Sequence, residues 1–226
     1  MNILLLGATG SIGKSVLSVI NQNNSELSLF GIAFNKNTIE ANNIVKNFAP
    51  SYVYIDDYDI FKNQNPTIKT KYINGDSALA DLINHEDVDV IICAISGFAG
   101  LKAAYIAAST GKKILLANKE SIVAGGDIIL PLAKSNNSEI IPIDSEHNAI
   151  FQCLLGEDDT KDVKKITITA SGGPFLNKKL SELKNVSKSE ALNHPNWKMG
   201  SKVTIDSATL VNKCLELIEA KYLFEL

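Results

Sequence analysis

Short apolar runs alternate with segments of helical spacing from the N-terminus to Ile143. The expected strands are Ile3–Leu6, Leu27–Phe34, Ser51–Ile55, Val88–Ile95, Lys113–Ala117 and Glu139–Ile143. Helices are expected over Lys14–Ile20, Ser77–Asn84, Gly100–Ser109 and within Ser121–Ala133. Because strands that alternate with helices form parallel sheets, the pattern predicts a doubly wound, mostly parallel α/β sheet.

The pattern changes after Leu155, where the polar segment 156–162 predicts a surface turn. Lys165–Ala170 alternates between polar and apolar residues, which is typical of a half-buried strand. Lys202–Asp206 predicts a further strand, and Ser207 would cap the helix that follows it. We therefore expect a Rossmann-like doubly wound domain over residues 1–144 and a smaller α+β domain over residues 145–226.

Three glycines, Gly7, Gly10 and Gly13, lie between the first strand and the first helix. Glycines there let backbone amides approach a pyrophosphate, and the helix N-terminus favours its negative charge. Thr9 and Ser11 can donate further hydrogen bonds. The spacing is a variant of the dinucleotide fingerprint, but its place between strand and helix favours nucleotide binding over a purely structural turn.

Lys36 follows the second strand, at the position that reads the adenosine ribose in dinucleotide-binding folds. It is flanked by Asn35 and Asn37 instead of a carboxylate. A cation suits a ribose 2′-phosphate, which predicts NADPH over NADH. An ordinary loop lysine is the alternative interpretation.

Polar clusters follow three of the predicted strands, at Ser96-Gly97, Asn118–Glu120 and Asp144–Glu146. Carboxyl ends of parallel strands meet at one edge, where ligands bind. In an extended segment Asp144 and Glu146 would face the same side and suit Mg²⁺ or Mn²⁺, although a solvated strand end is the alternative. Lys119 would either hold a substrate oxygen or belong to a helix cap.

The second half carries further candidate ligand groups. Ser171–Phe175 is a small-residue loop able to wrap an anion, or a tight turn without a ligand. Asn193–Gly200, which holds Trp197, predicts either a lid or a docked structural loop. Asn212, Lys213 and Glu216 share one helical face and, with Ser207, suit a phosphate, with Glu216 as a third carboxylate. An amphipathic surface helix capped by Ser207 is the alternative.

Composition narrows the class of protein. Hydrophobic content of 45%, charged content of 21% and a net charge of −3 indicate a globular protein and give no electrostatic case for nucleic acid or a membrane surface. The N-terminus lacks the basic lead and cleavage site of a signal peptide. The three cysteines have no disulfide or metal spacing. We therefore expect a cytoplasmic protein that binds neither nucleic acid nor membranes.

Six motifs together closely resemble the 1-deoxy-D-xylulose 5-phosphate reductoisomerase family, in the family's order and over essentially the whole chain. They are Gly7–Gly13, Leu116–Ser121, Ile143–Gln152, Ser171–Phe175, His194–Gly200 and Ile205–Glu216. The resemblance implies an NADPH-dependent, divalent-metal-dependent isomerisation and reduction of 1-deoxy-D-xylulose 5-phosphate to 2-C-methyl-D-erythritol 4-phosphate in isoprenoid synthesis. It also implies a homodimer, and Mg²⁺, Mn²⁺ or alternatively Co²⁺ as the metal.

The resemblance carries roles over to matching positions. Asp144, Glu146 and Glu216 would hold the metal and, with Lys119, act in catalysis. The phosphorylated deoxy-sugar would contact Ser145, Glu146, Ser171, His194, Ser207, Asn212, Lys213 and Glu216, with Trp197 and Met199 as a lid. NADPH would contact Thr9, Gly10, Ser11, Ile12, Lys36, Asn37, Asn118, Glu120 and Gly200.

The sequence also departs from the family pattern. Asn35 and Cys214 stand where small residues are usual. The sequence given ends at Leu226, before the remaining catalytic strands and the C-terminal helical domain that the resemblance implies. A non-catalytic NADP-binding fragment is therefore one alternative function. An NADP-dependent dehydrogenase acting on another aldehyde is a second, which would not need three converging carboxylates.

Overall fold

A computed structural model describes residues 1–61, 63, 69–156, 163–196 and 199–225. The chain divides into two compact units, Met1–Asp144 and Ser145–Leu226. Among the helices of the described residues, none combines the length and apolar character needed to cross a membrane.

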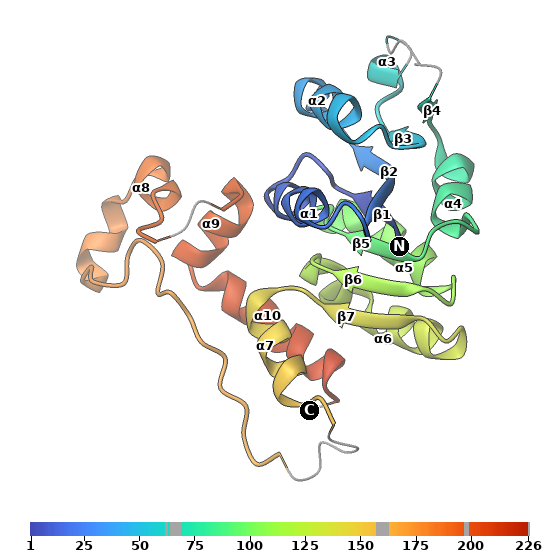
Figure 1. The fold of residues 1–226 in the computed structure, drawn as a ribbon. Helices are drawn as coiled ribbons and strands as arrows, with labels where there is room; N and C mark the ends of the chain where they lie inside the picture. Colours follow the sequence, from blue (N-terminus) through green and yellow to red (C-terminus); the bar gives the residue numbers. More distant parts are fainter. Residues whose placement is uncertain (62, 64–68, 157–162, 197–198, 226) are drawn as a thin grey trace. The chain divides into compact units, whose positions relative to one another are not determined.

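The first unit is built on a seven-stranded sheet of order β4-β3-β2-β1-β5-β6-β7 (Figure 1). Every neighbouring pair of strands is parallel. The predicted doubly wound, Rossmann-like α/β sheet is therefore confirmed. The strands are β1 (Asn2–Leu6), β2 (Ser28–Phe34), β3 (Tyr52–Ile55), β4 (Lys71–Ile73), β5 (Val90–Cys93), β6 (Lys113–Leu116) and β7 (Glu139–Pro142).

Helices cover both faces of this sheet. They are α1 (Ser11–Gln22), α2 (Thr38–Phe48), α3 (Tyr58–Phe61), α4 (Asp76–Asn84), α5 (Leu101–Ala108) and α6 (Lys119–Ser135), with the 3₁₀ turn η1 (Phe98–Gly100) before α5. Leu17 of α1 and Ile44 of α2 belong to one core cluster with Leu5 of β1. Leu4 points to the opposite face of the sheet from Leu5. The side chains of Leu4 and of Leu82 in α4 both lie against Gly31, so α4 packs on that face.

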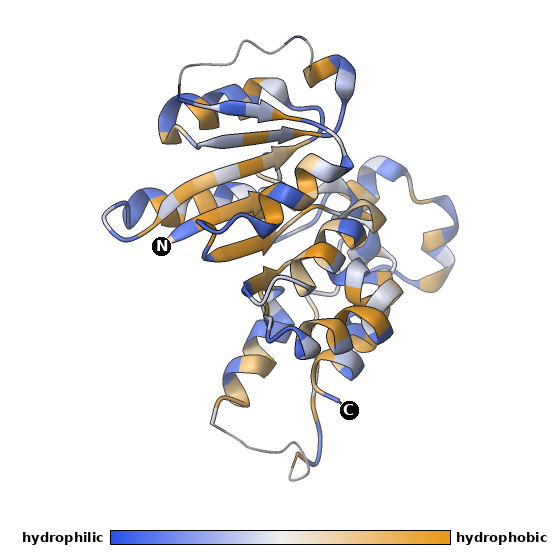
Figure 2. Cartoon of the chain, turned by 90° about the vertical axis from the view of Figure 1, so that its right-hand side faces the viewer, coloured by the Kyte–Doolittle hydropathy of each residue, from blue (hydrophilic) through white to orange (hydrophobic). Residues whose placement is uncertain are grey.

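Burial on both faces explains why the central strands are apolar throughout. Leu4, Leu5 and Leu6 of β1 are fully buried. Figure 2 shows these strands as hydrophobic, whereas the helices around them carry hydrophilic residues as well. The continuous apolar runs of the sequence are therefore the signal of a covered parallel sheet.

The direction of winding reverses between β1 and β5, because β2, β3 and β4 lie to one side of β1 and β5, β6 and β7 to the other. Gly7 follows β1 at this point with φ +95°, a conformation that favours glycine. A Cβ on Gly7 would lie 2.5 Å from the carbonyl oxygen of Ala94, just after β5. Ligands of open α/β sheets bind at such a reversal.

Among the described residues of the second unit, the regular secondary structure is helical. The elements are α7 (Ser145–Cys153), the 3₁₀ turn η3 (Leu180–Asn185), α8 (Lys188–Leu192), α9 (Ser201–Ala208) and α10 (Val211–Leu223). The expected strand Lys202–Asp206 is wrong, because these residues lie within α9, where Lys202 and Asp206 pair across one turn at 2.6 Å. The expected strand Lys165–Ala170 is also wrong: it has the alternating sequence but no strand assignment.

Helix α10 differs from its prediction in start and in orientation. Leu210, with φ 62°, separates α9 from α10 as the N-cap of α10. Ser207 therefore lies in the last turn of α9 and does not cap α10. Asn212, Glu216 and Glu219 are the buried side, whereas Leu217 and Ile218 are exposed. The interpretation as an ordinary surface helix with its polar face in solvent is wrong.

We predict that Gly7→Ala destabilises the protein by about 3 kcal/mol or more, because backbone strain and a clash with Ala94 add. Gly75→Ala is the matched control. Gly75 has a similar φ of +92°, but a Cβ there would meet no atom within 4 Å. Urea unfolding followed by circular dichroism measures both, and equal losses for the two variants would contradict the close-approach role of Gly7.

Candidate functional site

The loop between β1 and α1 holds Thr9, Gly10, Ser11 and Ile12, which were predicted to contact a nucleotide. Gly10 is the N-cap of α1, with an extended backbone and no side-chain hydrogen bond to the first turn. Gly10, Ser11 and Ile12 are exposed. A helix N-terminus whose amides are not capped by a side chain suits an anionic group.

Lys36 and Asn37 lie between β2 and α2. The Asn37 side chain accepts a hydrogen bond from Glu40 N at 3.1 Å and caps α2. Lys36 is exposed beside the same helix start. The amide is therefore employed in the fold, while the Lys36 ammonium faces solvent near the positive end of a helix.

Asn118 connects the ends of β5 and β6. Its Nδ2 donates to the Ile95 carbonyl at 2.7 Å, to the Gly97 carbonyl at 2.9 Å and to Glu120 Oε2 at 3.0 Å. Its Oδ1 accepts from Ser121 N at 2.9 Å and caps α6. These bonds engage both the oxygen and the nitrogen of the Asn118 amide. A contact between this side chain and a cofactor stays a prediction, and it would require some of these hydrogen bonds to break.

Lys119 and Asp144 pair at the adjoining strand ends. Lys119, the first residue of α6, is 6% exposed, and its Nζ lies 2.8 Å from Asp144 Oδ2. Asp144 follows β7 and directly precedes α7. The strand order places β6 beside β7, which explains why two residues from different loops meet.

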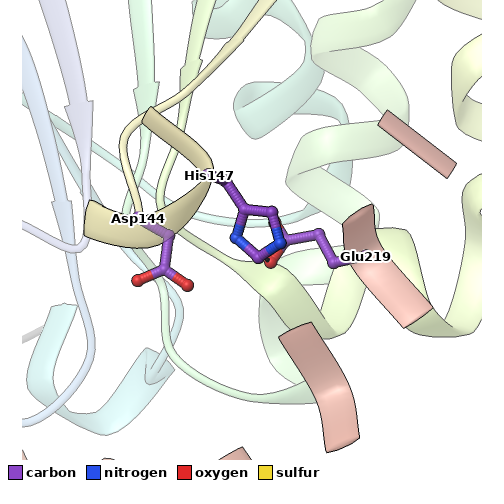
Figure 3. A group of neighbouring side chains, drawn as sticks. All are labelled: Asp144, His147 and Glu219. Carbon is purple, nitrogen blue, oxygen red and sulfur yellow. Dashed lines mark ion pairs between the residues drawn. The ribbon is translucent and has the colours of Figure 1, made fainter. Parts of the chain in front are cut away.

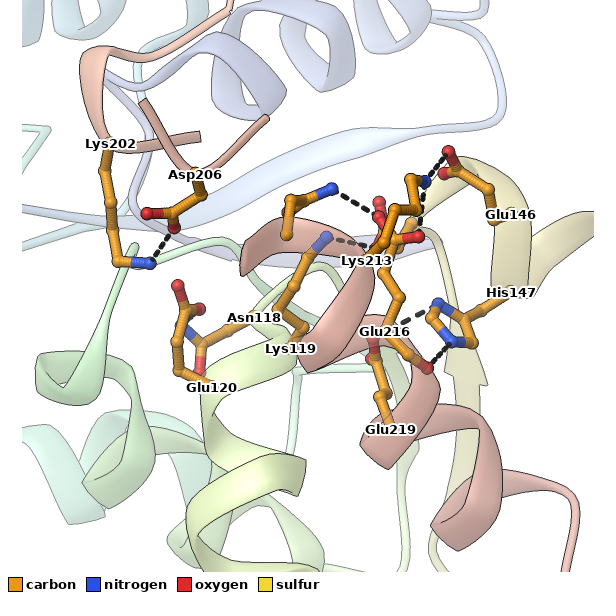
Figure 4. Close-up of polar contacts among 12 residues, drawn as sticks. Asn118, Lys119, Glu120, Glu146, His147, Lys202, Asp206, Lys213, Glu216 and Glu219 are labelled. Atoms are coloured by element: carbon orange, nitrogen blue, oxygen red, sulfur yellow. Dashed lines mark hydrogen bonds and ion pairs between the residues drawn. The ribbon is translucent and has the colours of Figure 1, made fainter. Parts of the chain in front are cut away.

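In the second unit, Lys213 of α10 bridges two of the predicted metal ligands (Figure 4). Its Nζ lies 2.5 Å from Glu146 Oε1 and 2.5 Å from Glu216 Oε2. The two glutamates each offer a carboxylate oxygen, and these lie within 4.8 Å of each other. Oxygen ligands at this separation suit a hard divalent cation.

The geometry that brings these carboxylates together is not the expected one. The expected extended segment from Asp144 to Glu146 is wrong, because α7 begins at Ser145 and Glu146 lies in its first turn. Glu146 meets Glu216 because α7 packs against α10, which the pairing of their side chains shows.

Glu216 is the most deeply placed of these residues, with a side chain 1% exposed. Asn212 Nδ2 donates to its Oε1 at 2.5 Å, one turn earlier on the same helix. Burial of a carboxylate costs several kcal/mol unless charge and hydrogen bonds compensate it. Asn212 and Lys213 supply both, so the polar face of α10 can lie inside.

Behind this group lies a second buried pair that the sequence interpretation missed (Figure 3). His147 Nδ1 lies 3.1 Å from Glu219 Oε2, and both side chains are fully buried. The other ring nitrogen of His147 lies 2.9 Å from the Glu216 carbonyl oxygen. His147 thereby ties α7 to α10 next to both Glu146 and Glu216. The i, i+3 spacing of Glu216 and Glu219 was the available signal.

Ser171, His194 and Ser207 gather at another place in the second unit. Asn196 N donates to His194 Nδ1 at 3.2 Å, so a neutral ring carries its proton on Nε2, which lies 2.9 Å from Ser171 Oγ. Gly173, with φ +66°, comes so close to Ser207 that a Cβ would lie 2.8 Å from its carbonyl oxygen. The small-residue loop thus joins the three residues.

The predicted lid falls partly outside the described residues. Trp197 is one of the residues that the structure does not describe, whereas Met199 is half-buried and Gly200 is the N-cap of α9. The Gly200 carbonyl accepts from both Thr204 N and Thr204 Oγ1 at 3.0 Å. A lid function and a cofactor contact at Gly200 stay predictions.

Comparison with known proteins gives this arrangement a family. Residues 3–126 match the family described as 1-deoxy-D-xylulose 5-phosphate reductoisomerase, and residues 140–224 match its C-terminal domain. The proteins named 1-deoxy-D-xylulose 5-phosphate reductoisomerase from Vesicomyosocius okutanii and from Francisella tularensis subsp. novicida are each 44% identical, over 100% and 98% of this chain.

Solved structures agree. DOX-P reductoisomerase in complex with NADPH, fosmidomycin and magnesium is 40% identical, with a TM-score of 0.93 over 100% of this chain and 59% of that chain. The Zymomonas mobilis reductoisomerase in complex with NADPH is 37% identical, with a TM-score of 0.87 over 100% of this chain and 58% of that chain. The chain spans 59% and 58% of the lengths of the two sequence relatives.

The fold and the charged groups define a Rossmann-like α/β protein whose sheet edge and second unit both carry paired lysines and carboxylates. With the family match over both units, the chain belongs to the 1-deoxy-D-xylulose 5-phosphate reductoisomerase family.

We predict strong energetic coupling between His147 and Glu219, because removing one partner takes a polar contact away from the other inside the protein. A double-mutant cycle with His147→Gln and Glu219→Gln should give a coupling energy of about 1–3 kcal/mol in chemical unfolding. The control cycle, Lys202→Met with Asp206→Asn, should give about 0.5 kcal/mol, because Lys202 is exposed. Equal coupling in both cycles would contradict the compensation assigned to the buried pair.

We predict an acid titration near the Ser171 loop. Hydrogen bonds from Lys178 and Ser187 lower the pKa of Glu190 from 4.5 to about 2. Because the pKa is lowered in the folded state, these contacts stabilise above pH 4.5 and are lost as the pH falls through about 2. Carboxyl ¹³C NMR should give a midpoint near this value, and Lys178→Met should raise it. An unshifted midpoint in the unsubstituted protein would refute the contact.

Proposed function

We propose that this chain carries the NADPH-dependent and divalent-metal-dependent conversion of 1-deoxy-D-xylulose 5-phosphate to 2-C-methyl-D-erythritol 4-phosphate. The observation that supports the proposal most directly is the meeting of Glu146 and Glu216 around Lys213 in a chain of this family. The relatives named 1-deoxy-D-xylulose 5-phosphate reductoisomerase indicate the substrate, and the solved DOX-P reductoisomerase complex contains NADPH and magnesium.

The donor set fits a hard divalent cation such as Mg²⁺ or Mn²⁺. Glu146 and Glu216 offer carboxylate oxygens within 4.8 Å of each other. Asp144, which immediately precedes α7, would add a third carboxylate. Asp144, Glu146 and Glu216 would hold the cation, which would supply Lewis-acid chemistry to a substrate carbonyl and its neighbouring hydroxyl.

The other polar residues would bind and orient the substrate. The Ser171 hydroxyl accepts from Gly173 N at 3.3 Å and lies against His194, so its own proton can point to an anionic oxygen. Ser207 lies beside this loop, and Ser145, Asn212 and Lys213 lie near the carboxylates. Binding the phosphate would anchor the unreactive end of the substrate and so align its reacting carbons.

NADPH would bind along the carboxyl edge of the sheet. Gly10, Ser11 and Ile12 present the start of α1 to the pyrophosphate, and Lys36 suits the 2′-phosphate. Thr9, Asn37, Asn118 and Glu120 lie at the same edge, and Gly200 is a further proposed contact. We further propose that the protein acts in the cytoplasm as a homodimer.

NADPH oxidation tests the activity. With 1-deoxy-D-xylulose 5-phosphate and Mn²⁺ or Mg²⁺, oxidation should proceed and stop on chelation. Glu146→Gln should lower the rate on the order of 100-fold or more, because it removes a charged metal ligand. Glu26→Gln, at an exposed glutamate, is the matched control. Oxidation that survives both chelation and Glu146→Gln would refute the metal role, whereas NADPH binding without turnover would favour the non-catalytic alternative.

Nucleotide titration tests Lys36. Lys36→Glu should weaken NADPH binding about tenfold or more and leave NADH binding nearly unchanged, because only NADPH carries the 2′-phosphate. Lys46→Glu, in the last turn of α2, is the control. Equal effects of Lys36→Glu on the two nucleotides would contradict the assignment.

A further inference from the structure

The Lys213 ammonium holds the carboxylates to which the proposed function assigns a divalent cation. It lies 2.5 Å from an oxygen of Glu146 and 2.5 Å from an oxygen of Glu216. Two carboxylates side by side repel each other, and the ammonium offsets this repulsion. A divalent cation would perform the same electrostatic task at the same oxygens.

A divalent cation at Glu216 would lie next to the Lys213 ammonium. The Glu216 Oε1 accepts from Asn212 Nδ2, and its Oε2 faces Lys213 Nζ. The Glu216 side chain is 1% exposed, so little solvent is present to screen charges there. A cation at the same oxygens would repel the ammonium, so Lys213 is the partner that must move.

The side chain of Lys213 is able to move. It is 23% exposed, and Glu146, its second partner, is 22% exposed. The side chain of Lys119, the lysine that pairs with Asp144 in the first unit, is by contrast only 8% exposed. A lysine with four rotatable bonds at the border of solvent can redirect its ammonium, whereas an enclosed one is held by its surroundings.

We propose that Lys213 is an exchangeable counter-ion of Glu146 and Glu216. It leaves these carboxylates when a divalent cation binds, and its charge then becomes available to the anionic end of the substrate. This inference rests on the proposed metal site, and goes beyond it by linking metal binding to anion binding through one side chain. Neither ligand needs to contact the other.

The link has a thermodynamic consequence. If a bound cation releases Lys213 toward an anion, the anion must in return tighten the binding of the cation by the same factor. Removing the ammonium should remove a competitor for the carboxylates and thus tighten metal binding. It should also abolish the coupling between the two ligands.

Metal titration tests both effects. Mn²⁺ binding to the full chain is followed by the electron paramagnetic resonance of free Mn²⁺, with and without methyl phosphate as the anion. Lys213→Met should bind Mn²⁺ about tenfold more tightly than the unsubstituted chain, a size typical of such coupling. Methyl phosphate should tighten Mn²⁺ binding in the unsubstituted chain and not in Lys213→Met.

Two further variants separate this effect from general causes. Lys202→Met removes an equal charge from a lysine that pairs with Asp206 in α9, and should leave Mn²⁺ binding and its coupling unchanged. Lys213→Gln keeps a hydrogen-bond donor beside buried Glu216 and serves if Lys213→Met does not fold, which thermal unfolding checks. Lys213→Gln should also bind Mn²⁺ more tightly than the unsubstituted chain.

Chemical labelling tests the movement itself. Mg²⁺ should increase the rate of acetylation of Lys213 severalfold, measured by mass spectrometry, and leave that of Lys202 unchanged. If the chain binds Mn²⁺ but the Lys213 variants bind it no more tightly, or if Mg²⁺ leaves Lys213 labelling unchanged, the inference is overturned. If Glu146→Gln and Glu216→Gln do not weaken Mn²⁺ binding, the metal site of the proposed function fails instead.

Discussion

The burial of Glu216 is the constraint on which the second unit depends. A carboxylate that is 1% exposed needs a compensating charge and hydrogen bonds, and it receives them from Lys213 and Asn212 of its own helix. The same ammonium reaches Glu146, so compensation of one buried charge also positions a second carboxylate from α7. His147 and Glu219 fasten the two helices behind them. Stability and ligand geometry therefore come from one set of contacts.

The first unit solves a simpler physical problem. Its central strands are apolar on both faces, and parallel pairing sends the end of every strand to one edge. Loops at that edge need no long-range polar network to meet, since the strand order alone brings β1 beside β5 and β6 beside β7. Gly7 and the hydrogen bond from Asn118 to the Ile95 carbonyl then set how closely the loops after β1 and β6 approach the end of β5. Apart from Asn37 and Asn118, whose side chains take part in the fold, the polar residues of this edge can therefore serve ligands.

The sequence predicted the apolar strands of the sheet because their burial appears directly as hydrophobic runs. It did not predict β4, a three-residue strand that is only partly buried, or the helix α2. Lys202–Asp206 alternates like a strand, but a helix-compatible ion pair and the Gly200 cap favour α9. The polar interior of α10 could not be foreseen from hydropathy, because its partner Glu146 lies 67 residues from Lys213. The shared face of Asn212, Lys213 and Glu216 was expected from helical spacing, whereas the roles of His194 and Gly200 came from the family resemblance.

The central claim is that Glu146 and Glu216 hold a divalent cation in place of Lys213. Crystals of the full chain soaked in Mn²⁺ and measured at the manganese absorption edge test this most directly. We predict an anomalous peak for Mn²⁺ within bonding distance of both carboxylates. The Lys213 ammonium should then no longer be hydrogen-bonded to either carboxylate. A peak at another place, or a Lys213 that still bridges both carboxylates beside bound Mn²⁺, would contradict this claim.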